Sequence, residues 1–247
     1  FMKLLPSIYL VGSGSTGIYL TNYLDCNVYL VDCKTEYVLI DSGAGYDIKP
    51  LLSEINRIVR SDKPLSSILL THHHGDHAGG AALLKELYHC RVYAPAAETA
   101  SIVSADEHLM GLDVARDAGF YPPDYHFSPC QVDVMIQPGM SFSIGNTIFS
   151  VFDASGHSTA GVCYYLTKEQ KHILFVGDLL CFNGLISLQN IPGANLEHYR
   201  DSVLSLESVP VDCFFPGHGC FSLSDGDKHI QKAISAFRSL AIPQNFI

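Results

Sequence analysis

Residues 71–77 read Thr-His-His-His-Gly-Asp-His, a run of potential ligands between two apolar segments. The run directly follows residues 68–70, whose apolar character predicts a buried strand. It directly precedes a helical pattern that includes Leu83, Leu84 and Leu87. Because α/β proteins usually hold their ligands in loops at strand ends, the run predicts an α/β fold with a binding loop at this position.

The spacing within this run predicts metal binding. His72 and His74 are two residues apart, so an extended backbone points both imidazoles the same way. Asp76 and His77 follow one turn later, so their side chains can face a second metal position. Imidazole and carboxylate ligands suit Zn²⁺, and also Fe or Mn. A structural site closes with four ligands, whereas this pattern predicts an open site for two ions.

Three isolated residues in glycine-flanked turns after predicted strands are further candidate ligands: His157, Asp178 and His218. Glycine lets the backbone bend sharply and approach a ligand closely. Each of these residues alone is more typical of an ordinary turn than of a ligand. Three such turns in addition to the histidine run predict one common site.

The remaining pattern alternates strands and helices. Runs of β-branched and aromatic residues predict strands at 8–11, 28–31, 37–40, 68–70, 91–94, 132–136, 141–144, 147–152, 162–166, 172–176 and 213–215. Apolar residues at helical spacing predict helices at 48–59, 83–88, 196–206 and 230–241. Asn195 is predicted to cap the third helix.

The two halves of the chain repeat one order of elements. Each has a strand ending in an acidic residue (Asp41 or Asp178), then a helix, then a strand ending in a histidine loop. This order predicts two β/α layers packed face to face around one core. No linker marks a domain boundary, so residues 1–247 are predicted to form a single domain.

A segment of mixed structure at about 96–130 interrupts the regular elements. Such a long segment often serves as a lid or substrate wall. A plain structural connection is the alternative interpretation.

Charge and hydropathy narrow the choice of partners. Lys and Arg total 15 against 25 Asp and Glu, which gives a net charge of −10. A nucleic-acid surface needs clustered cations, and no apolar run reaches the ~18 residues of a membrane helix. We therefore expect a small-molecule substrate, with no nucleic-acid or membrane partner. The oligomeric state is left open.

The eight cysteines lie mostly in apolar contexts, and none are spaced Cys-x-x-Cys. This pattern is typical of reduced thiols in a core. Reduced thiols favour a cytoplasmic location.

The candidate ligands share one order along the chain: His72-x-His74-x-Asp76-His77, then His157, Asp178 and His218, the last three each preceded by glycine. In this order and spacing they resemble the metallo-β-lactamase superfamily. Asp41, in Leu-Ile-Asp-Ser-Gly, matches the family's upstream acidic residue. The resemblance runs from about residue 37 to residue 218. It implies an α/β (α+β) fold, a four-layer αβ/βα sandwich with the site at one edge of the two sheets.

The resemblance also implies two divalent metal ions, with Zn²⁺ as the first expectation and Fe or Mn as alternatives. One ion would lie on His72, His74 and His157. The second would lie on Asp76, His77 and His218, with Asp178 bridging. A hydroxide held between the ions would attack a carbonyl carbon. Asp76 or a metal-bound water would shuttle a proton, and Asp41 would hydrogen-bond a ligand from behind.

Departures from the family's branches narrow the expected activity. True β-lactamases usually lack the bridging Asp, so Asp178 speaks against antibiotic hydrolysis. Glyoxalase II carries a large C-terminal helical domain, whereas 29 residues follow His218. Acyl-homoserine lactonases usually carry a tyrosine where this chain has Cys181. Another tyrosine would have to take its place: Tyr121, Tyr125 or Tyr199.

The favoured interpretation is a metal-dependent hydrolase of an ester, thioester or lactone. Phosphodiester or β-lactam hydrolysis on the same site is an alternative. An iron-dependent oxidoreductase or a metal-binding sensor is a second, non-hydrolytic alternative.

Residues 12–17 read Gly-Ser-Gly-Ser-Thr-Gly and fit the dinucleotide-binding pattern G-x-G-x-x-G. That motif requires a helix beginning near Gly14, whereas residues 18–23 are β-prone. We therefore predict a glycine-rich turn near the mouth of the site. His73 is predicted to point away from the metals.

Overall fold

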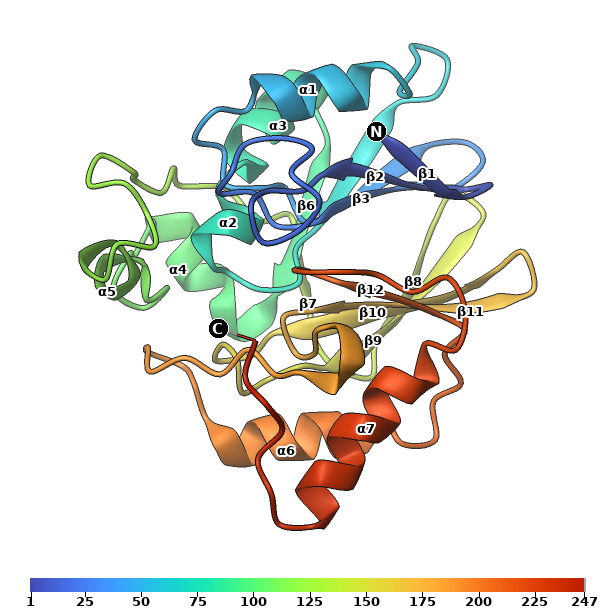
Figure 1. The fold of residues 1–247 in the computed structure, drawn as a ribbon. Coiled ribbons are helices and arrows are strands. Elements are labelled where there is room, and N and C mark those ends of the chain that lie inside the picture. Colours follow the sequence, from blue (N-terminus) through green and yellow to red (C-terminus); the bar gives the residue numbers. More distant parts are fainter. Residues whose placement is uncertain (247) are drawn as a thin grey trace.

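The computed structural model describes residues 1–246. Figure 1 shows two β-sheets packed face to face, with α1 and α3 over the outer face of one sheet. Helices α6 and α7 cover the outer face of the other. This arrangement confirms the predicted four-layer αβ/βα sandwich.

The first sheet has seven strands in sequence order: β1 (Met2–Leu5), β2 (Ile8–Gly12), β3 (Val28–Asp32), β4 (Tyr37–Ile40), β5 (Leu65–Leu69), β6 (Arg91–Pro95) and β7 (Val134–Ile136). Strands β1 to β4 pair antiparallel, and β4 to β7 pair parallel. The helices in this half are α1 (Lys49–Asn56), α2 (Gly75–Ala78) and α3 (Ala81–Tyr88).

The second sheet has five strands in the order β12 (Cys213–Pro216), β11 (Lys171–Gly177), β10 (Val162–Lys168), β9 (Thr147–Asp153) and β8 (Ser141–Ile144). Only β11 and β12 pair parallel. Its covering helices are α6 (Leu196–Ser205) and α7 (Asp227–Arg238). Among residues 1–246, no helix combines the length and apolar character needed to cross a bilayer.

The central core lies between the two sheets. Tyr29 from the first sheet meets Phe175 and Phe215 from the second, with ring centroids 5.4 and 5.2 Å apart. All three side chains are buried, and tilted aromatic pairs at these distances add stability beyond their buried area. Separate apolar clusters lie between each sheet and its helices.

Two parallel strand pairs set the position of the site. The units β4-α1-β5 and β11-α6-β12 match the repeated order seen in the sequence. Parallel strands present their carboxyl ends at one sheet edge. Asp41 and His72 therefore follow neighbouring strands in one sheet, as Asp178 and His218 do in the other.

Several element bounds differ from the predicted ones. Residues 2–5 form a strand of their own, paired with β2, whereas the first predicted strand begins at residue 8. Helix α7 begins at Asp227, three residues before the predicted start. The prediction missed this first turn because its residues are polar and do not belong to the apolar residues at helical spacing. The segment 96–130 contains η1 (Ala96–Glu98), α4 (Thr99–Ser104) and α5 (Leu112–Asp117), joined by loops.

All eight cysteines are unpaired within the described chain, and all but Cys220 are buried. This finding agrees with the prediction of core thiols. Burial raises the pKa of Cys90 to about 12, which keeps such a thiol neutral and unreactive.

Replacement of the α6 cap is expected to destabilise the fold. The Asn195 side chain accepts hydrogen bonds from the backbone N–H groups of Glu197 and His198. We expect Asn195→Ala to lower the free energy of unfolding by about 1 kcal/mol, measured by urea denaturation. Asn195→Asp keeps an acceptor and is the control. Equal losses in both variants would contradict the capping role.

Candidate metal centre

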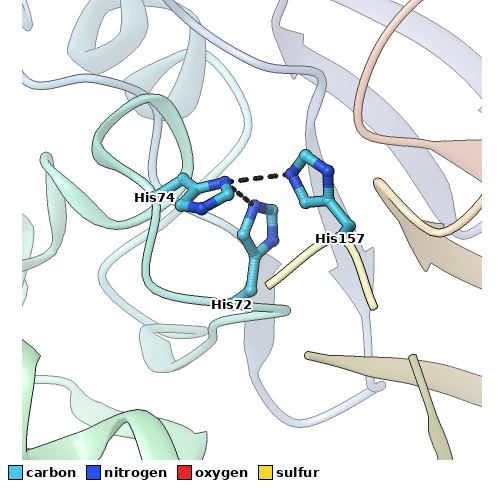
Figure 2. A group of neighbouring side chains, drawn as sticks. All are labelled: His72, His74 and His157. Atoms are coloured by element: carbon cyan, nitrogen blue, oxygen red, sulfur yellow. Dashed lines mark hydrogen bonds between the residues drawn. The ribbon is translucent and has the colours of Figure 1, made fainter. Parts of the chain in front are cut away.

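Three histidines from two loops converge on one point. His72 and His74 follow β5, and His157 lies in the turn between β9 and β10. Nδ1 of His74 lies 3.1 Å from Nε2 of His72 and 2.9 Å from Nε2 of His157. Figure 2 shows the three imidazoles pointing toward one another. All three are buried, so their facing nitrogens form a compact donor set.

A second group lies beside the first. Nε2 of His218 is 3.0 Å from Oδ2 of Asp76, and 3.4 Å from Nε2 of His77. Oδ1 of Asp178 lies 3.2 Å from Nε2 of His77, and its Oδ2 lies 3.4 Å from Nε2 of His157. Asp178 therefore stands between the two groups. The structure brings together all seven predicted ligands.

On the first-sheet side, the outward nitrogens of His72 and His77 have partners that fix the two rings. Nδ1 of His77 is 2.8 Å from Oδ2 of Asp41, and Nδ1 of His72 is 2.9 Å from Oγ1 of Thr71. Asp41 also accepts the backbone N–H of Thr71 at 2.7 Å. Such outer partners set the tautomer, which leaves the inward nitrogen free to bind a metal.

Asp41 has a strained backbone, with φ at +61° in the left-handed region. A non-glycine residue rarely adopts this conformation, and when it does the strain is often found at functional sites. Here the conformation places the carboxylate between Thr71 and His77. The geometry agrees with the role expected for Asp41 behind the ligands.

The histidines on the other side are held by loops far away in the sequence. Nδ1 of His157 hydrogen-bonds the backbone carbonyl of Ser187. Nδ1 of His218 lies 2.7 Å from Oγ1 of Thr16, within the glycine-rich turn at residues 12–17. That turn was expected near the mouth of the site, but the contact of Thr16 with a ligand was not predicted.

The electrostatics of the cluster fit a cation. Burial, together with the neighbouring histidines, lowers the pKa of His72 and His74, so both are neutral donors. Burial opposes protonation of His218, but the Asp178 and Asp76 carboxylates raise its pKa to about 9. Within residues 1–246, the ion-pair partners of these two carboxylates are all histidines. The buried Asp178 and the half-buried Asp76 carboxylates therefore lack a permanent cationic partner, which divalent ions would supply.

Steric and hydrogen-bonding details also fit. Oδ1 of Asp178 is buried and has no hydrogen-bond partner among the described residues. A Cβ built on Gly217 would lie 2.2 Å from that oxygen and 2.5 Å from Cε1 of His77. The site thus contains a carboxylate oxygen without a hydrogen-bond partner, which is available to a metal ion. It also brings the backbone of residue 217 so close to Asp178 and His77 that only glycine fits there.

Two thiols near the ligands are not nucleophiles. Burial raises the pKa of Cys26, which lies beside Asp41 and His77, to about 12. Burial likewise raises the pKa of Cys181, three residues after Asp178. Cys181 is buried and does not line the cavity described below, in agreement with the prediction of an inert core thiol.

His73 points away from the cluster, as predicted. Its Nδ1 lies 2.8 Å from Oγ of Ser101, and its backbone N–H donates to Glu98. The other oxygen of Glu98 accepts the backbone N–H of Ala160. Glu98 therefore connects the loop after β5 with the loop that carries His157, a link that no sequence motif indicates.

A cavity of 210 Å³ opens onto the cluster. Its floor is formed by five of the candidate ligands: His74, Asp76, His157, Asp178 and His218. Its walls come from four separate segments: Ser15, Thr16, Tyr23 and Leu24; Met110, Gly111, Leu112, Ala115, Phe120 and Tyr121; Gln189 and Ile191; and Phe246. Most of the wall is apolar. Phe246 was missed in the sequence because only the tertiary fold brings it to this cavity.

Comparisons with known proteins agree with this geometry. The family model of the metallo-beta-lactamase superfamily matches residues 21–218. The chain belongs to the metallo-beta-lactamase superfamily, and its class is that of the metal-dependent hydrolases. It shares the fold of a metallo-beta-lactamase from Cronobacter sakazakii, with a TM-score of 0.73, 21% identity and coverage of 97% and 95% of the two chains.

Two relatives carry activity names. A hydroxyacylglutathione hydrolase of Rhodopseudomonas palustris is 36% identical over 103 residues, which cover 38% of this chain. An atrochrysone carboxyl ACP thioesterase of Aspergillus fumigatus is 27% identical over 196 residues, 78% of this chain. The chain spans 39% and 50% of the lengths of these two relatives.

Gly217→Ala is expected to weaken metal binding by about tenfold or more, because the added Cβ would displace Asp178 or His77. Competition between the protein and a chromogenic zinc chelator measures the affinity. Gly139→Ala adds the same methyl group where nothing lies within 4 Å. Its φ of +86° makes this change costly for stability, but because the residue lies outside the cluster it should keep the metal affinity of the parent. Equal affinities for the two variants would contradict the close approach at Gly217.

Proposed function

We propose that this chain binds two divalent metal ions and hydrolyses a small ester, thioester or lactone. The observation that carries the proposal is the convergence of seven donor side chains in one cluster, five of which form the floor of the cavity. Five imidazoles and two carboxylates favour zinc among the common metals, with iron or manganese as alternatives.

The proposed ligand assignment follows the two groups. His72, His74 and His157 would hold one ion, because they form one buried donor cluster. Asp76, His77 and His218 form the second cluster. Asp178 faces both groups through its two oxygens, which supports a bridging role.

Two such ions, when bound, supply Lewis acidity toward a carbonyl oxygen and lower the pKa of a coordinated water. The chain's own residues orient this chemistry. Asp41, Thr71, Thr16 and the Ser187 carbonyl fix the rings of four of the five histidines, all except His74. Burial alone would raise the pKa of the Asp76 carboxyl group. The nearby imidazoles of His77 and His218 outweigh this effect and lower that pKa below its usual value.

The ionised Asp76 carboxylate lies at the cavity floor, where it can accept a proton from the attacking water. In the net reaction, the water oxygen bonds to the carbonyl carbon, and the bond to the leaving oxygen or sulfur breaks. The proton passes to the leaving group, which departs as an alcohol or thiol.

The cavity walls favour an uncharged substrate with a compact apolar group. Within residues 1–246, no Lys or Arg side chain lines the cavity. The two metal ions would be the cations of the cavity, so a charged group away from the scissile bond, such as the phosphate of a thiol carrier, would have no cationic side chain as partner. The volume of 210 Å³ lies below the ~300–1,000 Å³ of typical ligand pockets, which suits a short acyl group.

We also propose that residues 96–130 form a substrate wall, because Met110, Leu112 and Phe120 from this segment line the cavity. The hydrolase and thioesterase names of the relatives are consistent with a carbonyl substrate. The likeness to β-lactamases concerns the fold alone and gives no support to β-lactam hydrolysis. That reaction is kept as an alternative for the substrate panel described below.

Removal of the metals is expected to abolish hydrolysis. Chelation followed by dialysis should eliminate turnover of a short-chain thioester, and two equivalents of Zn²⁺ should restore it. His74→Ala and Asp178→Ala should each lower kcat/KM by more than about 100-fold, since each removes a ligand. Metal content by elemental analysis and initial rates are the measurements. His198→Ala changes an exposed histidine and is the control. Activity indifferent to chelation would contradict the proposal.

A substrate panel separates the candidate reactions. We expect the highest kcat/KM for uncharged esters, thioesters or lactones with short apolar acyl groups. Bis(p-nitrophenyl) phosphate and a cephalosporin should be cleaved at least about tenfold less efficiently, since the cavity offers no side-chain cation for their anionic groups. Preferential cleavage of the phosphodiester would overturn the carbonyl assignment, while leaving the metal assignment in place.

A further inference from the structure

We propose that Tyr121 is a positioning residue for Asp76. Its phenol holds Oδ1 of Asp76, so that the carboxylate presents only Oδ2 to the group formed with His77 and His218. This role rests on the proposed function, because it assigns Asp76 as a ligand of the second metal.

The contacts of Asp76 divide its two oxygens between different partners. The Tyr121 hydroxyl donates to Oδ1 at 2.7 Å. Oδ2 lies 3.0 Å from Nε2 of His218 and 3.7 Å from Nε2 of His77. The backbone N–H of Asp76 also donates to the phenol oxygen at 3.2 Å. One hydroxyl therefore holds both the side chain and the backbone of this residue.

The phenol is itself held in place by a rigid frame. The Tyr121 ring stacks on that of Tyr125, with centroids 4.9 Å apart and an interplanar angle of 16°. The Tyr125 hydroxyl contacts the backbone carbonyls of Ala44 and Gly75 at 2.8 and 3.0 Å. Arg116 donates to the Tyr125 carbonyl at 2.8 Å. These contacts tie the segment 96–130 to helix α2, which carries Asp76.

A carboxylate without such a partner has more freedom at a metal. Its second oxygen can rotate inward and compete for coordination. A hydrogen bond to Oδ1 restricts this rotation, as partners behind metal ligands commonly do. Tyr121 lines the cavity, but its proton is engaged by Asp76. We therefore assign it to ligand orientation rather than to substrate binding.

Tyr121→Phe tests the role, because it removes only the hydroxyl and keeps the stacked ring. We expect the affinity for the second metal equivalent to fall by about 10- to 100-fold, with little change for the first. Chelator competition with Co²⁺ measures both affinities. The visible spectrum of the Co²⁺ form should also change, because it reports the ligands around the metal.

Tyr125→Phe is the matched control. It removes the same atom from the neighbouring stacked tyrosine, which touches backbone carbonyls and not a carboxylate. We expect it to lower thermal stability while keeping both Co²⁺ affinities and the spectrum. A matching loss of metal affinity in both variants would show a general structural role, and would overturn the specific assignment to Asp76.

The remaining outcomes are distinct. Unchanged Co²⁺ affinities in Tyr121→Phe, with a raised KM, would make Tyr121 a substrate contact and overturn its positioning role. Unchanged affinities and kinetics would overturn the role entirely. Wild-type protein that binds a single metal would refute the two-metal function, and this role with it. Wild-type protein with two metals and an unaffected variant would refute the role alone.

Discussion

The site depends on two parallel strand pairs that end at the same edge of two facing sheets. Asp41 and the histidine run follow β4 and β5, and Asp178 and His218 follow β11 and β12. The packing of Tyr29 against Phe175 and Phe215 fixes the distance between the sheets. The donor atoms are therefore positioned by the core, and not by loops alone.

Seven clustered donor side chains, six of them buried and two of them carboxylates, are costly for a chain to hold without cations. Much of the surrounding structure restrains them. Asp41 has a strained backbone conformation that places its carboxylate on His77. Gly217 has no side chain, which leaves room for Asp178 to lie close to it. Because such donor atoms converge only in the folded state, metal binding and folding stability should be coupled.

The sequence was sufficient to predict the layers, most strands and the seven convergent residues, because each depends on local periodicity or on a short motif. The histidine run is unusual in itself, and glycines mark the other three positions. The partners behind the ligands were harder to predict. Thr16, Ser187 and Glu98 act through contacts that span many residues along the chain. No local pattern distinguishes a threonine that meets His218 from any other threonine in a turn.

The segment 96–130 illustrates the same limit. Its mixed composition indicated an insertion, and Tyr121 was one of three tyrosines proposed on the sequence alone. The structure places its hydroxyl on Asp76, whereas Tyr199 lies behind the site and contacts the Asp178 and Leu179 carbonyls. Only the packing of loop against loop separates these cases, since all three residues look alike in the sequence.

Phe246 lines the cavity, and its backbone pairs with Ile186, beside the Ser187 carbonyl that holds His157. This placement has a practical consequence for handling the protein. A bulky label attached at Phe246 would therefore occupy the cavity wall. Figure 1 shows N beside α1 and apart from C, so a label near residue 1 is the better choice for surface immobilisation.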